Sequence, residues 1–538
     1  MGPTGPVLRR RRPRAVGGDP ELSRGSRRGP GDPGLAQGSL HVAVLHVGRH
    51  NVRKWLLGGL ALVLVLCGGG AAALVYFFAR PPLDVRVVFD RALRIPPIAD
   101  SRQGEQGRRV FELQARSGDS DFGHGATRTW GYNGAYLGPT LRAKRGEAVA
   151  VNVRNALSET TTVHWHGMHL PAAMDGGPHR PIAPGGSFQA AWTVDQPAAT
   201  LWYHPHPSER TETQVYRGLA GLFIVDDDEP AQRALPHDYG VDDIPVLVQD
   251  KQFDGDQLSM GERLGSDIGV LGDEILVNGT PRPYLDVRSE LVRLRLVNAS
   301  TARIYNFGLA GGRPFALVGT DGGLLDRPYM TDHVRLSVGE RAEIVVALEP
   351  GERLTLRSEQ ALGGDLESKF NGGRDAFDIL QLRAGASLTP ATLPKTLVAT
   401  PRLDPEQAAQ TRSFVFQGRE ISGRGMDMSR ADAVVVKDTI EVWNIANGHD
   451  TPHSFHIHDV QFQVLLVDGR APPPELSGWK DTVFLAPKQR YRVIARFADY
   501  ADPATAYMFH CHVLKHEDEG MMGQFVVVEP GQQPRLHG

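Results

Sequence analysis

The stretch LGPTLRAKRGEAVAVNVRNAL, residues 137–157, alternates apolar and polar side chains after a turn that contains Gly and Pro. A period of two is typical of a β-strand with one buried face. Two later stretches repeat the pattern, ILVNGTPRPYLDVRSELVRLRLVNAS at 275–300 and MDMSRADAVVVKDTIEVWNIAN at 426–447. Asn155, Asn298 and Asn444 mark equivalent points, 143 (298 − 155) and 146 (444 − 298) residues apart. Such a long period, filled with short strands, predicts three successive β-sandwich domains.

Length and composition agree with an all-β chain of several domains. The 538 residues are too many for one core, and the 61 glycines and 38 prolines indicate many turns. We place the sandwiches at residues 85–230, 240–390 and 395–530, with a linker around 382–410 before the third. The formal net charge of −3 implies no strongly charged partner and gives no support for nucleic-acid binding.

The N-terminal region differs from the rest of the chain. Residues 1–54 are basic and rich in Gly and Pro, which predicts a disordered tail. Residues 55–79 form an uncharged apolar run of 25 residues, long enough for a transmembrane helix. The basic flank predicts a single-pass anchor with the sandwiches on the extracytoplasmic side of the cell membrane. The alternative is a cleaved signal peptide, because AAA at 71–73 resembles a cleavage site, and the protein would then be secreted.

The chain has only two cysteines, Cys67 in the apolar run and Cys511 near the C-terminus. No disulfide framework is therefore expected. A lone thiol in an extracytoplasmic domain is exposed to oxidation unless something occupies it. The lone thiol therefore favours a metal at Cys511.

Histidines gather in four short clusters, two in the first unit and two in the third, and a random scatter would not produce this pattern. The motifs are HWHG, WYHPH, HSFHIH and HCHVLKH, and they contain His164, His166, His204, His206, His453, His456, His458, His510, His512 and His516.

Parity along a strand sorts these residues into two kinds of site. Alternate side chains share a face, so each H-x-H pair points to one side and can bind metal ions between sheets. His453 and Cys511 have the opposite parity to their neighbours and are free to form a separate site. With His516, and Met521 as a weak axial contact, they give the ligand set of a blue-copper electron-transfer centre.

With these four motifs in order, residues 100–530 resemble the multicopper oxidases. The resemblance implies three cupredoxin-like Greek-key domains and four copper ions. It implies a type 1 copper at His453, Cys511, His516 and Met521, and a type 2 copper at His164 and His456. Two type 3 coppers would take His166, His204, His206, His458, His510 and His512. The implied activity is one-electron oxidation of a reducing substrate, coupled to reduction of dioxygen to water.

Two acids match positions to which the family assigns proton transfer. Asp175, in MDGG after HWHG, resembles the carboxylate that serves the type 2 side. Glu517, directly after His516, resembles the carboxylate that relays protons to the type 3 pair. The alternative is a turn aspartate and a solvated glutamate.

The sequence leaves two classes of reducing substrate, phenols and low-valent metal ions such as copper(I). The chain resembles the bacterial branch of laccase-like enzymes and copper-efflux oxidases, but it has no methionine between Met330 and Met426. Met426, Asp427 and Met428 could bind copper(I) near the blue site, since soft thioethers suit that ion. A strand-entry turn that packs two methionines into the core explains them equally well.

Two functions of other classes compete. One is a scaffold protein of the same fold without copper, which the complete ligand set disfavours. The other is a copper nitrite reductase, which the third domain and the H-C-H motif disfavour.

Overall fold

The computed structural model describes residues 81–363 and 366–536. Within them the chain forms many short strands and few helices, so the all-β prediction is confirmed. The predicted tail at 1–54 and the predicted membrane span at 55–79 lie outside the described residues. No helix in the described part of the chain is both long and apolar enough to cross a bilayer.

The first pair of sheets encloses one apolar core. One sheet has the order β3-β4-β7-β9 with β5 beside β4, and the other has the order β6-β11-β10-β8. The bounds are β3 (Ser101–Gln103), β4 (Arg109–Asp121), β5 (Ala126–Tyr132), β6 (Leu141–Lys144), β7 (Ala148–Asn155), β8 (His164–His166), β9 (Ser187–Thr193), β10 (Ala199–His204) and β11 (Gly221–Asp226). Phe111 and Val151 of one sheet share a buried cluster with Leu201 and Phe223 of the other.

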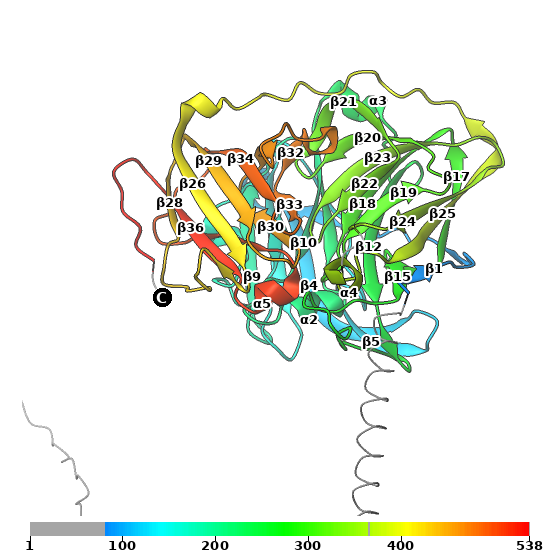
Figure 1. The fold of residues 1–538 in the computed structure, drawn as a ribbon, viewed down its shortest axis with the longest axis horizontal. Helices are drawn as coiled ribbons and strands as arrows, with labels where there is room; N and C mark the ends of the chain where they lie inside the picture. Colours follow the sequence, from blue (N-terminus) through cyan, green and yellow to red (C-terminus); the bar gives the residue numbers. More distant parts are fainter. Residues whose placement is uncertain (1–80, 364–365, 537–538) are drawn as a thin grey trace, which may run out of the picture. The chain divides into compact units, whose positions relative to one another are not determined.

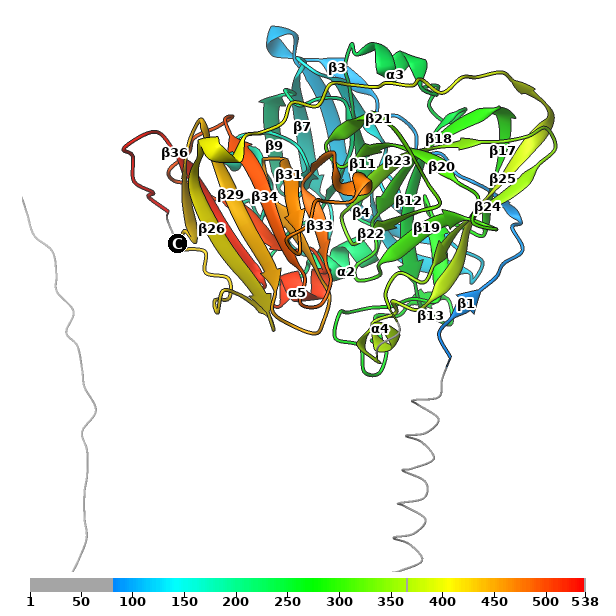
Figure 2. The same cartoon turned by 45° about the horizontal axis from the view of Figure 1, so that its top comes forward.

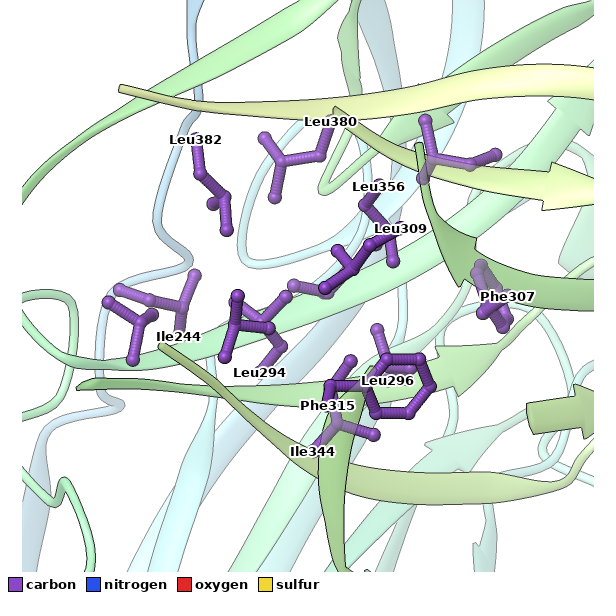
Figure 3. Packing of buried hydrophobic residues seen from close by; sticks show 14 of the residues in the cluster. Ile244, Leu294, Leu296, Phe307, Leu309, Phe315, Ile344, Leu356, Leu380 and Leu382 are labelled. Carbon is purple, nitrogen blue, oxygen red and sulfur yellow. The ribbon is translucent and has the colours of Figure 1, made fainter. Parts of the chain in front are cut away.

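The second sandwich packs two larger sheets face to face. Their orders are β2-β17-β25-β24-β19-β22, with β1 beside β25, and β16-β15-β12-β18-β23-β20-β21. The bounds are β1 (Asp84–Val85), β2 (Arg91–Ala92), β12 (Asp243–Lys251), β15 (Glu274–Val277), β16 (Thr280–Pro281), β17 (Pro283–Ser289), β18 (Leu291–Asn298), β19 (Tyr305–Leu309), β20 (Phe315–Thr320), β21 (Gly323–Thr331), β22 (His333–Leu336), β23 (Arg341–Ala347), β24 (Arg353–Glu359) and β25 (Ala376–Thr389). Figure 3 shows Leu294 and Leu296 of β18 pointing into this core with Leu309, Leu356 and others, as the alternation requires.

The third sandwich lies in the yellow-to-red part of the chain (Figure 2). Its sheets have the orders β27-β26-β29-β34-β31-β32 and β28-β36-β35-β30-β33. The bounds are β26 (Ala408–Gln417), β27 (Glu420–Ile421), β28 (Ala433–Val436), β29 (Thr439–Asn447), β30 (His453–Ile457), β31 (Phe462–Val467), β32 (Trp479–Lys480), β33 (Thr482–Leu485), β34 (Arg490–Phe497), β35 (Tyr507–Cys511) and β36 (Met522–Val528). Phe455, Tyr491 and Phe525 belong to its buried cluster.

The described chain also contains short α-helices and a small hairpin. They are α2 (Thr211–Tyr216), α3 (Pro230–Ala234), α4 (Leu366–Phe370), α5 (Leu514–Asp518), and the hairpin of β13 (Phe253–Asp254) and β14 (Gln257–Leu258). Helices α2 and α5 lie side by side (Figure 1). The backbone N–H groups of Thr211 and Glu212 donate to the Asp518 carboxylate at 2.7 and 2.9 Å, which satisfies the start of α2.

An asparagine at the end of one strand repeats in all three sandwiches. The Asn155 side-chain amide donates to two backbone carbonyls, of Glu159 and Ile182, both at 2.8 Å. Asn298 does the same to Arg303 and Leu336, and Asn447 to Thr451 and Leu485. The third equivalent is thus Asn447, and our assignment of Asn444 was wrong, because β29 continues three residues further before this turn.

The start of the first predicted domain has an unexpected partner. β1 and β2 fall within the range 85–230 or at its edge, yet β1 pairs with β25 and β2 pairs with β17, both in the second sandwich. The chain therefore passes along the second sandwich before it enters the first. The three domain ranges stay predictions.

A buried lysine joins the first and second sandwiches. Lys251, at the end of β12, is 1% exposed, and its ammonium donates to Tyr216 O at 2.7 Å and lies 4.2 Å from the Tyr216 ring centroid. Burial lowers the pKa of Lys251 to about 7, against an opposing effect of the Asp250 charge.

We expect this lysine to make the free energy of unfolding depend on pH. Between the folded pKa of about 7 and the ordinary value of 10.5, only the unfolded chain carries the proton, so stability should rise with pH. The slope should approach ~1.4 kcal/mol per pH unit for one group. Urea unfolding of wild type and Lys251→Met from pH 7 to 9 measures it. Equal slopes for the two proteins would contradict the assignment.

Candidate metal centre

The predicted ligands come together at two buried places. The histidines of β8 and β10 lie on neighbouring strands, with His164 opposite His204. In the third sandwich, β30 and β35 pair in the same way, with His456 opposite His510. Segments roughly 300 residues apart thus meet at the seam between the first and third sandwiches. The ten predicted histidines, Cys511 and Met521 are all at most 1% exposed.

The smaller cluster contains one cysteine and two histidines. His453 Nδ1 and His516 Nδ1 are 3.1 Å apart, and each lies 3.5 Å from Cys511 Sγ. The His516 Nε2–H donates to Asp267 O at 3.1 Å, which leaves the Nδ1 lone pair facing the sulfur. Met521 is adjacent, because its carbonyl accepts the Cys511 N–H at 3.1 Å. Burial raises the pKa of Cys511 to about 12, so the thiol needs a bound cation to ionise at neutral pH.

The larger cluster contains the other eight histidines. Their ring nitrogens form three compact groups, each within 4.8 Å: His164, His166 and His456; His166, His204 and His512; and His206, His458 and His510. In the last group His510 Nε2 lies 3.2 Å from both His206 Nε2 and His458 Nε2. Cys511 stands between His510 and His512 in the chain, so one tripeptide joins the two clusters.

Hydrogen bonds on the outer side orient most of these rings. Nδ1 of His164, His204, His456 and His510 each lies 2.9–3.2 Å from a backbone carbonyl oxygen, respectively of Asp175, Pro205, Asp481 and Cys511. A neutral ring that donates from Nδ1 presents its lone pair at Nε2, towards the cluster centre. The His166 ring is reversed: its Nε2 lies 3.0 Å from Asp481 Oδ1, and its Nδ1 faces His512 Nε2 at 3.1 Å.

This arrangement fits bound transition-metal ions. His164 Nε2, His204 Nε2 and His456 Nε2 are buried and have no hydrogen-bond partner among the described residues. His458 Nδ1 bonds the Asp175 carboxylate, so the Nε2 atoms of His458 and His510 point lone pairs at each other across 3.2 Å. Burial lowers the pKa of His510 well below its usual value, which keeps the ring neutral. Opposed lone pairs are repulsive unless a cation lies between them, and imidazole nitrogens suit copper.

The two predicted acids both contact the eight-histidine cluster. The Asp175 carboxylate lies 2.7 Å from His458 Nδ1 and 3.3 Å from His164 Nδ1, so it contacts predicted ligands of both the type 2 and type 3 ions. Gly176 has φ +76° and a Cβ there would lie 1.7 Å from Val163 O, so only glycine allows this turn. Burial acts to raise the pKa of Asp175, but the charge interactions with His458 and His164 outweigh it and lower the pKa.

Glu517 has the opposite electrostatic environment. Its two carboxyl oxygens lie 3.2 Å from His206 Nδ1 and 3.3 Å from His510 Nδ1. Burial, followed by the negative charge of Asp518, raises the pKa of Glu517 well above its usual value. Asp175 therefore favours the ionised form, and Glu517 favours the protonated form.

The predicted substrate residues lie on a surface turn beside the smaller cluster. The Met426 N–H donates to Gly520 O at 3.0 Å, one residue before Met521. Met426 and Met428 are half-buried, whereas Asp427 is exposed. The Asp427 carboxylate already accepts bonds from the Ser429 backbone and hydroxyl at 3.0 and 2.7 Å. Hydrogen bonds within the turn therefore already use part of the accepting capacity of the Asp427 carboxylate.

Sequence reasoning missed several polar residues behind the histidines. Arg341, Asp481 and Thr482 are buried, and Asp481 and Thr482 contact His166 directly. Lys480 and Glu340 form a further buried ion pair beside them at 2.8 Å. These residues have no repeated spacing and come from two sandwiches, so the sequence carried no signal for them.

Comparisons with known proteins place this geometry in a family. Models described as multicopper oxidase match residues 115–230, 250–373 and 393–531. Multicopper oxidase mco of Staphylococcus haemolyticus is 36% identical over 444 residues, covering 80% of this chain and 91% of its own. Cell division protein FtsP of Edwardsiella tarda is 34% identical over 481 residues, covering 87% and 97%. A laccase crystal structure from Pediococcus acidilactici Pa5930 has a TM-score of 0.75 and 33% identity, covering 84% and 96%. The chain belongs to the multicopper oxidase family and has its cupredoxin-like fold.

Proposed function

We propose that this protein binds four copper ions and couples one-electron oxidation of a reducing substrate to reduction of dioxygen to water. The observation that carries the proposal is the connection of a Cys–His–His cluster to an eight-histidine cluster through residues 510–512. The type 1 ion would be held by His453, Cys511, His516 and Met521, and the type 2 ion by His164 and His456. The type 3 pair would be held by His166, His204, His206, His458, His510 and His512.

The bound copper would accept electrons one at a time and deliver four of them to each dioxygen. The protein's part begins at Cys511, whose backbone continues directly into His510 and His512 and provides a short covalent path between the clusters. Forming two waters also requires four protons. Glu517, which favours the protonated form, can hold a proton 3.2–3.3 Å from two ligand rings. Asp175 accepts the N–H of His458 and fixes that ring.

Two chemical classes of reducing substrate fit this activity. We favour a small phenol or a low-valent metal ion, with copper(I) captured by Met426 and Met428. The hydrogen bonds of Asp427 to Ser429 argue against an important role for Asp427 in copper(I) binding. We also propose that the oxidase works outside the cytoplasm, anchored by residues 55–79. Recovery in washed membranes would support the anchor, and release into the medium would favour cleavage.

A role in cell division is the second candidate, because the FtsP relatives carry that name. It does not require catalysis and corresponds to the copper-free scaffold. The complete set of convergent nitrogen and sulfur atoms favours the oxidase, since a scaffold needs none of them.

We expect the purified protein, loaded with copper, to hold about four ions per chain and to consume dioxygen. Elemental analysis should accompany steady-state dioxygen uptake with phenols, copper(I), iron(II) and manganese(II), with nitrite as an alternative acceptor. A variant with Met426→Leu and Met428→Leu should lose rate with copper(I) only, if these thioethers bind that substrate. Absence of copper and of uptake with every substrate would favour the scaffold. Nitrite turnover without dioxygen uptake would favour the reductase.

A further inference from the structure

The second sandwich carries none of the predicted ligands, yet one of its arginines reaches the site. Arg341 is fully buried at the start of β23, and all five of its N–H donors are used. Nε donates to Thr200 O at 3.1 Å in the first sandwich. Nη1 and Nη2 donate to Gly339 O and Asp321 O in the second sandwich at 3.2 and 3.0 Å. Each also donates to one Asp481 carboxylate oxygen in the third sandwich, at 2.6 Å. One guanidinium thus joins all three sandwiches.

Asp481 carries this connection to the histidines. Its Oδ1 lies 3.0 Å from His166 Nε2 and accepts the Thr482 hydroxyl at 2.8 Å. Thr482 Oγ1 lies 3.1 Å from both His166 Nε2 and His456 Nδ1, and Asp481 O accepts from His456 Nδ1 at 3.0 Å. The two rings stack with centroids 3.8 Å apart. The Asp481–Thr482 pair therefore contacts one predicted type 3 ligand and one predicted type 2 ligand.

The contact with Asp481 decides which nitrogen of His166 faces the cluster. A carboxylate in a bidentate pair with arginine can only accept, so His166 Nε2 must carry the hydrogen. The lone pair then lies on Nδ1, which faces His512 Nε2 at 3.1 Å. His164, His204, His456 and His510 have the opposite orientation, because backbone carbonyls accept from their Nδ1 atoms. His166 is thus oriented by a charged pair instead of by the backbone.

Tight packing leaves this pair little room to rearrange. Gly167 has φ +85°, and a Cβ there would lie 2.7 Å from an Arg341 terminal nitrogen and 2.8 Å from Asp481 Oδ2. Gly339 has φ +87°, and its Cβ would lie 3.0 Å from the His512 ring and 3.1 Å from the His166 ring. Both glycines are required by close approach as well as by conformation.

We propose that Arg341 and Asp481 are positioning residues through which the second sandwich sets the tautomer and orientation of His166, and so controls copper occupancy at the eight-histidine cluster. The inference rests on the proposed function. The described hydrogen bonds and ion pairs of Arg341 and Asp481 include none to Cys511, His453 or His516, so the pair should act on the eight-histidine cluster. Loss of the pair should therefore release copper from the eight-histidine cluster while the copper at the Cys–His–His cluster stays bound.

The experiment measures copper retention and not turnover. Asp481→Asn keeps the shape but cannot pair with Arg341 through two negative oxygens, so copper affinity at the eight-histidine cluster should fall about 10- to 100-fold. After dialysis against a chelator at a concentration that wild type withstands, the variant should lose most of the three cluster ions and keep the blue absorbance. Arg341→Met should likewise lose cluster copper and keep the blue absorbance. The double variant should lose little more than either single variant, because the two residues act as one unit.

Arg295→Met is the matched control. Arg295 is also a buried arginine of the second sandwich, and its partners Thr200, Asp243 and Glu343 include no predicted ligand. It should lower stability without changing the ratio of cluster copper to blue copper. If wild type holds four ions and Asp481→Asn retains them as Arg295→Met does, the inference is overturned. Equal loss of blue and cluster copper in Asp481→Asn would also overturn it. A wild-type protein that binds no copper would overturn the proposed function itself, and the inference with it.

Discussion

Cys511→Ser should abolish the blue colour and reduce dioxygen uptake to background, while about three copper ions per chain remain bound. Cys511 Sγ lies 3.5 Å from both His453 Nδ1 and His516 Nδ1. A hard, neutral hydroxyl cannot replace a soft thiolate as a copper ligand. Electrons would then have no route from the type 1 site into residues 510–512. Absorbance, elemental analysis and a dioxygen electrode measure the three parts of the prediction.

The fold should survive this substitution. A serine hydroxyl at a fully buried position without a partner costs about 1–3 kcal/mol, which a chain of this size tolerates. Met508→Leu, a conservative change on the same strand β35, controls for disturbance of the strand and should keep colour and activity. Dioxygen uptake by Cys511→Ser at the wild-type rate would refute the assignment of the blue site.

Glu517→Gln should lower the rate of dioxygen reduction by about 10²–10⁴-fold with copper content unchanged, the usual range for loss of a positioned acid. The carboxyl is buried between His206 and His510, and burial raises its pKa well above the usual value, which favours the protonated form. The amide preserves the shape but cannot release a proton. Electrons should then enter faster than they leave, so the blue colour should fade during turnover.

Steady-state rates, copper content and absorbance during turnover test this expectation. Glu262→Gln is the matched control. Glu262 is exposed and forms an ion pair at 2.7 Å with Lys515, which lies on helix α5 as Glu517 does. It should have wild-type activity. A Glu517→Gln protein with an unchanged rate would show that protons arrive by another group, and one that has lost copper would indicate a structural role instead.

Local periodicity explains what could be predicted from the sequence. Alternation along strands places His164 and His166 on one face and separates His453 from His456, and both features appear in the structure. The repeat of the strand-end asparagine was detectable, but its third member was misplaced because Asn444 and Asn447 lie on one strand and only side-chain bonds distinguish them.

Interactions between distant segments could not be predicted in this way. Arg341 and Asp481 are 140 residues apart in the chain and meet only because two sandwiches pack together. The pairing of β1 and β2 with the second sandwich has the same cause, since a two-residue strand has no periodicity of its own. The contact of Asp175 with two kinds of predicted ligand likewise depends on how the first and third sandwiches meet.

The division of the eight histidines between the first and third sandwiches has a consequence for biogenesis. Half of the cluster is synthesised roughly 300 residues before the other half, and His512 comes only near the C-terminus. A newly made chain therefore cannot assemble all eight histidines until its last strands have docked. If copper binds as proposed, its insertion at this cluster would have to follow the docking of β35, and a truncated chain would lack half of the ligands.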